Sequence, residues 1–238
     1  MDVNPKPWQD VWRDLQDVWK RNVEDKDIWQ NLNQEWRRLF APAQQWWDGL
    51  TPVWKTALKA QLHIFDAGHT PSEEELKKIM ALQKLHLADS EINDLVPLKP
   101  LRYLQYLDLS STAVLDLKPL ALLPSLVHIE AANTRIYDLK PLKKLKNLRY
   151  LEVSMTDVED LAPLKVLAQL KALRCNHTYV RSLKPLYGLR KLESLHCQST
   201  PLTARAVRAF QRRFPQAELV FHFEEKTRSK PWWRWLGI

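Results

Sequence analysis

Glycine, cysteine and long apolar runs are all scarce in this 238-residue sequence, which contains four glycines and two cysteines. Four isolated glycines cannot build the glycine-rich loop that cradles phosphate groups. Cys175 and Cys197 lack the short spacing of a metal-binding cysteine pair. No window approaches the ~20 apolar residues of a membrane span, and the first residues lack the apolar run of a signal peptide. We therefore expect a cytoplasmic protein without a cofactor.

A 22-residue repeat organises the middle of the chain, between Leu82 and Leu202. Each repeat has three apolar columns spaced L-x-x-L-x-L, then a Ser or Thr column, and later a proline followed by leucine. The prolines that mark the period are Pro97, Pro119, Pro141, Pro163 and Pro185. A fixed period of this size indicates a solenoid, in which no coil can bury its leucines alone and neighbouring coils share one core.

The parts of each repeat predict its local structure. L-x-x-L-x-L predicts a short strand in a parallel sheet, with neighbouring strands roughly 4.8 Å apart. The Ser or Thr that follows can hydrogen-bond backbone groups of the turn. The phrase D-L-x-P-L carries the chain round the convex side, where proline gives up a donor that no strand needs. Cys175 and Cys197 occupy the third apolar column, so we expect reduced thiols in the core.

The full phrase L-x-x-L-x-L-x-x-T-x-V-x-D-L-x-P-L-x-x-L resembles the repeats of internalin-type bacterial leucine-rich repeat proteins. The resemblance covers about six coils, roughly half of the chain, and implies an α/β solenoid with a parallel sheet on its concave face. It implies much less about function, because such domains are mostly binding surfaces and the fold does not dictate what they bind.

Helices are predicted on both sides of the repeats. Residues 1–65 hold eight of the eleven tryptophans, at helical spacing, and could either cap the first coil or present anchors to a partner. Thr51 is predicted to cap one helix, and Thr70 with Glu73 forms a capping box for another over about 71–80. After the repeats, a helix over 203–213 and a strand over 219–223 predict a C-terminal cap.

These patterns divide the chain into four regions. We predict a tryptophan-rich helical region with the N-terminal cap at 1–80, leucine-rich repeats at 81–202, a C-terminal cap at 203–223 and a basic, tryptophan-rich tail at 224–238. The net charge of +8 is uneven, because Lys and Arg outnumber Asp and Glu by 25 to 15 in residues 81–238. This excess of basic residues is typical of a convex face that is kept soluble by charge. It is also compatible with binding to an acidic partner or an anionic surface.

The strand positions between the leucines place a group of polar and aromatic side chains on the concave face. Tyrosine and arginine are typical of interface centres, so this group is the predicted partner-binding site. Its histidine and carboxylates could also be read as metal ligands or an acid–base pair, but an open sheet offers no pocket that excludes water. The predicted site consists of Tyr106, Asp108, His128, Glu130, Tyr150, Glu152, Arg174 and His196.

The tail ends in a cluster of three tryptophans, Trp232, Trp233 and Trp235. These rings could insert at a membrane interface, bind a groove of another protein or fold back on this chain's own helices. The basic stripe around Lys140 has no interleaved aromatics, which argues against nucleic acid as a partner. The sequence thus favours a non-catalytic protein-binding module, with a membrane-peripheral scaffold held by the tail as the alternative.

Overall fold

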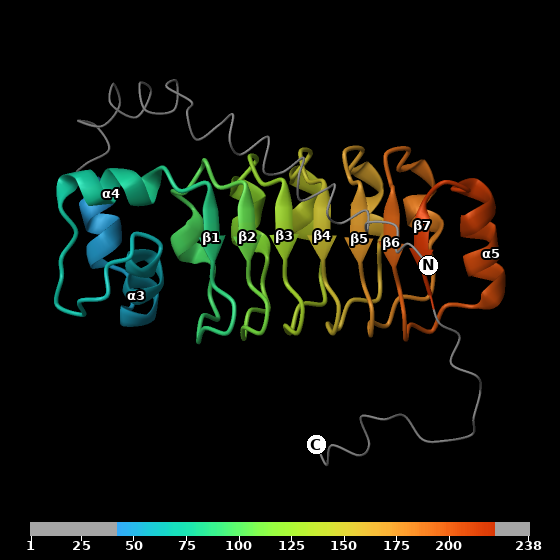
Figure 1. Ribbon diagram of the computed structural model, residues 1–238, viewed down its shortest axis with the longest axis horizontal. Coiled ribbons are helices and arrows are strands. Elements are labelled where there is room, and N and C mark those ends of the chain that lie inside the picture. Colours follow the sequence, from blue (N-terminus) through green and yellow to red (C-terminus); the bar gives the residue numbers. More distant parts are fainter. Residues whose placement is uncertain (1–41, 222–238) are drawn as a thin grey trace, which may run out of the picture.

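A computed structural model describes residues 42–221, which form a row of parallel strands with helices at both ends (Figure 1). The sheet has seven strands in sequence order, and each strand pairs in parallel with the next. The strands are Lys84–His86 (β1), Tyr106–Asp108 (β2), His128–Glu130 (β3), Tyr150–Glu152 (β4), Ala172–Arg174 (β5), Ser194–His196 (β6) and Glu218–Val220 (β7). The prediction of a leucine-rich repeat solenoid from L-x-x-L-x-L is confirmed.

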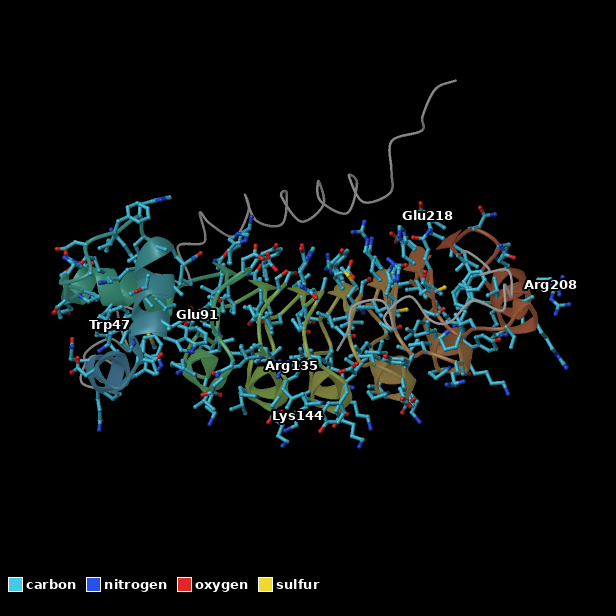
Figure 2. All side chains as sticks on the ribbon, turned by 90° about the horizontal axis from the view of Figure 1, so that it is seen from below. Trp47, Glu91, Arg135, Lys144, Arg208 and Glu218 are labelled. Atoms are coloured by element: carbon cyan, nitrogen blue, oxygen red, sulfur yellow. The ribbon has the colours of Figure 1, made fainter. Side chains whose placement is uncertain are left out.

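A 3-10 helix follows each of the first five strands, on the side of the solenoid opposite the sheet (Figure 2). The aspartate of D-L-x-P-L starts these turns: Asp116 Oδ1 accepts a hydrogen bond from the Lys118 amide at 2.9 Å, and Asp138 does the same for Lys140. The 3-10 helices are Val96–Leu98 (η1), Lys118–Leu122 (η2), Lys140–Lys144 (η3), Ala162–Val166 (η4) and Lys184–Gly188 (η5). The repeated phrase therefore turns the chain back at the same place in each coil.

The apolar columns of the repeat form the core between the sheet and the 3-10 helices. Leu107, Ile129 and Leu151 are 0% exposed, and each such side chain contributes about 1.5–3 kcal/mol by leaving water. Cys175 and Cys197 are free, buried thiols in the same layer. Burial raises the pKa of Cys197 to about 12, so both thiols behave as apolar core groups, as expected from the sequence.

The hydroxyl column closes the turn after each strand. Thr156 Oγ1 donates to the Val153 carbonyl at 2.6 Å, and Thr112 donates to the Leu109 carbonyl at 2.6 Å. In the other coils the hydroxyl likewise donates to the carbonyl three residues earlier. The pairs are Ser90–Leu87, Thr134–Ala131, Thr178–Cys175 and Thr200–Cys197. The predicted side-chain to backbone bond of the turn is thus present in every coil.

We expect Thr156→Val to lower the free energy of unfolding by about 1–2 kcal/mol, because the Val153 carbonyl loses its donor inside a buried turn. Thr70→Val is the matched control: Thr70 is exposed, so the same exchange should change stability by less than about 0.5 kcal/mol. Urea unfolding followed by circular dichroism measures both values. Equal effects in the two variants would contradict this role of the hydroxyl column.

Tryptophans attach the N-terminal helices to the first coil. Helix α3, Pro52–Ala60, begins at the predicted cap Thr51, whose side chain accepts a hydrogen bond from the Trp54 amide. Trp54 Nε1 donates to the Asp94 carbonyl at 3.1 Å, and Trp46 Nε1 donates to the Pro97 carbonyl at 3.0 Å. Trp54 is buried in the core cluster that runs through the repeats. The helices therefore close the open end of the solenoid, as the cap prediction required.

The capping box predicted at Thr70 is wrong by two residues. Helix α4 is Glu73–Met80, and its N-cap is Ser72, which accepts from the Glu75 amide at 3.3 Å while Glu75 Oε2 accepts from the Ser72 amide at 2.8 Å. The Ser72 amide and the His69 ring both donate to Glu75, and these bonds lower the pKa of its carboxyl to about 2. The sequence contains two overlapping boxes, and the one that gains the extra His69 bond is formed.

The C-terminal cap consists of α5, Ala204–Arg213, followed by β7. Thr203 caps α5 by accepting a hydrogen bond from the Ala206 amide, and Val207 and Phe210 are buried against the last coil. The last strand begins at Glu218, one residue before the predicted start, and ends at Val220. Helix and strand thus cover the end of the core opposite the tryptophan cap (Figure 1).

Candidate functional site

In-register pairing brings all eight predicted site residues together in two columns of the sheet. Tyr106, His128 and Tyr150 are paired across β2, β3 and β4 in the first column. The second column contains Asp108, Glu130, Glu152, Arg174 and His196, which are consecutive partners from β2 to β6. We call the surface formed by these two columns the sheet face; it is the concave face of the prediction and points away from the 3-10 helices.

Aromatic rings stack along the first column. The centroids of Tyr106 and His128 are 4.8 Å apart, those of His128 and Tyr150 are 3.9 Å apart with the rings nearly parallel, and His86 lies 4.9 Å from Tyr106. We call Tyr106, His128 and Tyr150 the ring column. These residues are 7%, 2% and 4% exposed, respectively. The rings are therefore buried by one another within the sheet face, although the sequence predicted Tyr106 and Tyr150 as partner-binding residues.

Glu130 is held in place by the ring column. Its Oε1 accepts a hydrogen bond from His128 Nε2 at 2.9 Å and from the Tyr106 hydroxyl at 3.1 Å. Burial favours the neutral forms of both partners, and it lowers the pKa of His128. For Glu130, burial is outweighed by the bonds from His128 and Tyr106 and by the charge of Arg174, so its pKa is lowered. At neutral pH a neutral imidazole thus donates to a fixed carboxylate that is 27% exposed.

Glu152 has a different environment, one strand further along. Its side chain is 7% exposed, and burial raises its pKa despite hydrogen bonds from Ser154 and the nearby Arg174 charge. Its Oε1 accepts from the Ser154 amide at 2.8 Å, and Arg174 Nη1 lies 3.6 Å from its Oε2. Glu152 therefore holds the Arg174 guanidinium, whose side chain is 33% exposed, at the surface.

Glu218 of β7 extends the sheet face and was missed by sequence reasoning. Its Oε2 accepts a hydrogen bond from the Ser194 hydroxyl at 2.9 Å and lies 3.7 Å from His196 Nε2. Burial and the Arg174 charge lower the pKa of His196. Glu218 pairs with Ser194, which lies 24 residues earlier, so a spacing of 22 residues does not align Glu218 with the earlier strand positions. Aligning Leu219 with Leu195 would have found it, because the residue before each core leucine faces the same way.

The accessible part of the sheet face is a row of charged and polar side chains. Asp108, Glu130, Arg174, His196 and Glu218 are each partly exposed along five strands. Within residues 42–221 no group of three or more His, Cys, Asp or Glu side chains is placed to hold a metal ion. No described helix is long and apolar enough to cross a membrane. The row presents fixed carboxylates, one guanidinium and one imidazole, which suits recognition of a charged, polar surface.

Some of the predicted sites lie outside the described residues. Trp232, Trp233 and Trp235 of the tail and the first 41 residues belong to this part of the chain. Insertion of the tail at a membrane interface, its binding to a protein groove and its return to the chain's own helices all stay predictions. Co-sedimentation of the full chain with liposomes, compared with a chain ending at Lys230, tests the first of them.

The ring column predicts a pH dependence of stability. The pKa of His128 is lower in the folded state than the ordinary 6.5, so the unfolded chain takes up the proton first as the pH falls. The stability that neutral His128 provides is fully present above pH 6.5 and is lost on acidification below it, at a slope of at most about 1.4 kcal/mol per pH unit for one proton. We expect His128→Gln to flatten the curve of unfolding free energy between pH 7 and pH 5.

The exposed His63 provides the matched control, because His63→Gln removes a histidine outside the ring column. Urea unfolding at pH 7, 6 and 5 gives the slope for each chain. His196 acts in the same direction as His128, and Glu152, with its raised pKa, acts in the opposite one, so the difference between the two variants isolates His128. If both variants keep the slope of the unaltered chain, His128 does not titrate between the two states.

Comparisons with known proteins find similar structures and no match by sequence. No protein-family model matches the chain, and no curated protein matches its sequence. An internalin (inlF) of Listeria monocytogenes superposes with a TM-score of 0.56 and 23% identity, over 63% of this chain and 45% of that one. Internalin C2 of the same species has a TM-score of 0.53 and 23% identity, over 72% and 92% of the two chains.

A leucine-rich repeat protein of Leptospira interrogans has a TM-score of 0.57 and 24% identity, over 64% of this chain and 40% of that one. This chain spans less than half the length of the Leptospira protein and of the first internalin. At this level of identity the superpositions establish architecture alone. The chain has the leucine-rich repeat fold of these bacterial proteins, with an internalin-like row of parallel strands.

Proposed function

We propose that this chain is a non-catalytic protein-binding module and that the sheet face is its binding surface. The chain shares the leucine-rich repeat fold of its structural neighbours, and solenoids of this kind form extended concave surfaces that are used for binding. The observation that carries the proposal is the row of charged groups already fixed in the free chain. Glu130 is held by His128 and Tyr106, and Glu218 by Ser194. A partner that binds such a row does not have to order these side chains, so less entropy is lost.

The charge of the row indicates the chemistry of the partner. Asp108 and Glu130 are paired neighbours on β2 and β3, and both are partly exposed. The lowered pKa of Glu130 keeps that carboxylate ionised at neutral pH. Arg174 lies on β5 beyond the buried Glu152. The surface thus offers two carboxylates on β2 and β3, a guanidinium on β5 and a further carboxylate, Glu218, on β7. It fits a protein whose basic side chain docks between β2 and β3.

The test is affinity capture from an extract of the organism that encodes the protein. The intact chain is compared with Asp108→Asn/Glu130→Gln, which removes two carboxylate charges from the row and keeps the shape of the side chains. Asp157→Asn/Glu159→Gln is the matched control: it removes the same charge from exposed residues between β4 and η4. Urea unfolding shows whether each variant is folded.

We expect a protein that is captured by the intact chain and the control and lost from the sheet-face variant. Its affinity, measured afterwards with the purified partner, should fall by at least about thirtyfold, the effect of removing a central contact worth about 2 kcal/mol. A partner that binds all three chains equally would place the binding surface elsewhere.

A further inference from the structure

A second charged surface lies at the C-terminal end of the solenoid, away from the sheet face. Helix α5 carries four arginines, and residues 203–217 contain no Asp or Glu. Arg205, Arg208 and Arg212 are spaced three and four residues apart, so they lie along one face of the helix, and all three are exposed. We call these three residues the arginine face. Figure 2 shows Arg208 extending from this end of the molecule into solvent.

The arginine face is not explained by the packing of the cap. Val207 and Phe210 attach α5 to the last coil from the opposite side of the helix. Arg213, the fourth arginine, donates from Nε to the Tyr187 carbonyl at 3.3 Å. In the part of the chain that the structure describes, no carboxylate lies within ion-pair distance of Arg205, Arg208 or Arg212. Like charges this close on one helix repel each other, so the face costs stability in the free protein.

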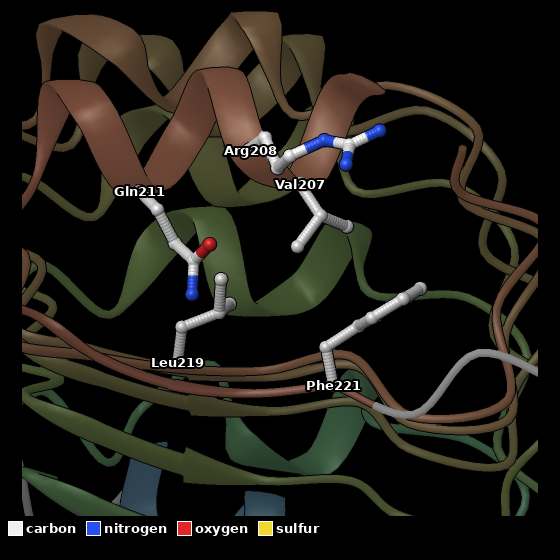
Figure 3. A pocket seen from close by; sticks show the side chains of 5 residues that line it. All are labelled: Val207, Arg208, Gln211, Leu219 and Phe221. Atoms are coloured by element: carbon white, nitrogen blue, oxygen red, sulfur yellow. The ribbon is translucent and has the colours of Figure 1, made fainter. Parts of the chain in front are cut away.

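Two adjoining hollows border the arginine face. The first, of about 660 Å³, is open to solvent and is lined by Arg205, Arg208, Gln211, Arg212 and Pro215. The second, of about 170 Å³, lies between α5 and β7 and is shown in Figure 3. In it, Val207 of the helix faces Leu219 of β7 and Phe221, the residue after β7, and Arg208 and Gln211 complete the lining. Arg208 and Gln211 line both hollows, so a basic surface continues directly into a small apolar groove.

Strand β7 adds a third feature beside the groove. It is the last strand of the sheet and pairs with β6 along one edge. Within the described residues no strand pairs with its other edge. An unpaired edge presents backbone donors and acceptors that can accept an added strand, which is a common way of binding an extended peptide.

We propose that the C-terminal cap binds an acidic, extended peptide segment of a partner protein. An apolar side chain of the segment would fill the groove between α5 and β7, its backbone would pair with the edge of β7 that faces away from β6, and its carboxylates would pair with the arginine face. The planar fork of a guanidinium matches a carboxylate with two parallel hydrogen bonds, which favours an acidic peptide among anions. The groove, with room for one side chain, favours a peptide over a nucleic acid duplex or a lipid surface.

The probe is a fluorescent decapeptide of alternating Glu and Leu, measured by fluorescence anisotropy with the full chain. In an extended strand the alternation places all leucines on one side, toward the groove. Three further probes separate the contributions: the same peptide with Ser for Leu, the same peptide with Lys for Glu, and a DNA duplex of matched charge. Vesicles with an anionic headgroup lipid are tested by co-sedimentation.

Two variants test the protein side. Arg205→Gln/Arg208→Gln/Arg212→Gln removes the arginine face, and Lys143→Gln/Lys144→Gln/Lys146→Gln removes the same charge from exposed lysines in and after η3. We expect the first variant to weaken binding of the Glu-Leu peptide at least tenfold and the second less than twofold. Phe221→Ala should also weaken it, and the Ser-containing and Lys-containing peptides should bind at least tenfold more weakly than the original.

Other outcomes overturn the proposal. Equal losses in the two charge variants would show that only the overall charge of the protein matters. Equal binding of the Glu-Leu and Glu-Ser peptides would remove the groove from the site. The duplex or the vesicles could bind more tightly than the peptide and lose this binding in the arginine variant. The arginine face would then be assigned to a nucleic acid or a membrane. If the peptide does not bind at millimolar concentration, the proposed peptide site is also wrong.

Discussion

Trp54→Ala is expected to lower the free energy of unfolding by about 3–5 kcal/mol, the usual cost of truncating a buried tryptophan to alanine. Trp54 is 4% exposed and belongs to the core cluster that continues into the first coil. Its Nε1 also donates to the Asp94 carbonyl, 40 residues away. One substitution thus opens a cavity at the solenoid end and removes a bond between cap and repeats. A loss of this size is a large part of the stability of a typical domain.

The variant Trp54→Phe separates these two contributions. Phenylalanine keeps an aromatic ring in the core and removes the Nε1–H, so we expect a smaller loss, of about 1–2 kcal/mol. Urea unfolding followed by circular dichroism is the measurement, because tryptophan fluorescence itself changes with the substitution. If Trp54→Ala costs no more than Trp54→Phe, the helices do not stabilise the first coil and the cap interpretation fails.

The repeat was predictable from the sequence because the burial requirement that produces it recurs in every coil. Leu107, Ile129 and Leu151 recur every 22 residues because each coil must place an apolar side chain in the same layer of a shared core. The same reasoning places Glu130 beside Asp108 and Glu152, since in-register parallel strands align equivalent positions. Both the core and the composition of the sheet face follow from that one register.

The missed features depend on contacts that the period does not encode. Ser72, and not Thr70, caps α4, and its partner Glu75 also accepts a bond from His69, a contact that lies outside the repeat. Glu218 was missed because α5 lengthens the last coil by two residues. The column places His128 between Tyr106 and Tyr150, but the burial of His128 depends on how closely the three rings stack, which the register alone does not specify.

Leu151→Ala in the central strand β4 should destabilise the protein by about 2–5 kcal/mol, the range for leucine truncation in a packed core. Leu151 is 0% exposed, and its position is paired with Ile129 on one side and Leu173 on the other. In a solenoid each coil is stabilised mainly by its two neighbours, so a cavity in a middle coil weakens two interfaces at once. The substitution should also broaden the urea transition, because the two halves of the repeat become less coupled.

The same substitution in the last strand, Leu219→Ala, is the matched control. Leu219 is partly exposed and is paired with Leu195 on one side, so it contributes to one interface between coils. We expect Leu219→Ala to cost less than half as much as Leu151→Ala and to leave the steepness of the transition unchanged. Equal losses at the two positions would mean that the coils unfold as a single unit, whose stability does not depend on which interface is weakened. A larger loss at Leu219 would instead show that the C-terminal cap, and not the middle of the repeat, limits the stability of the solenoid.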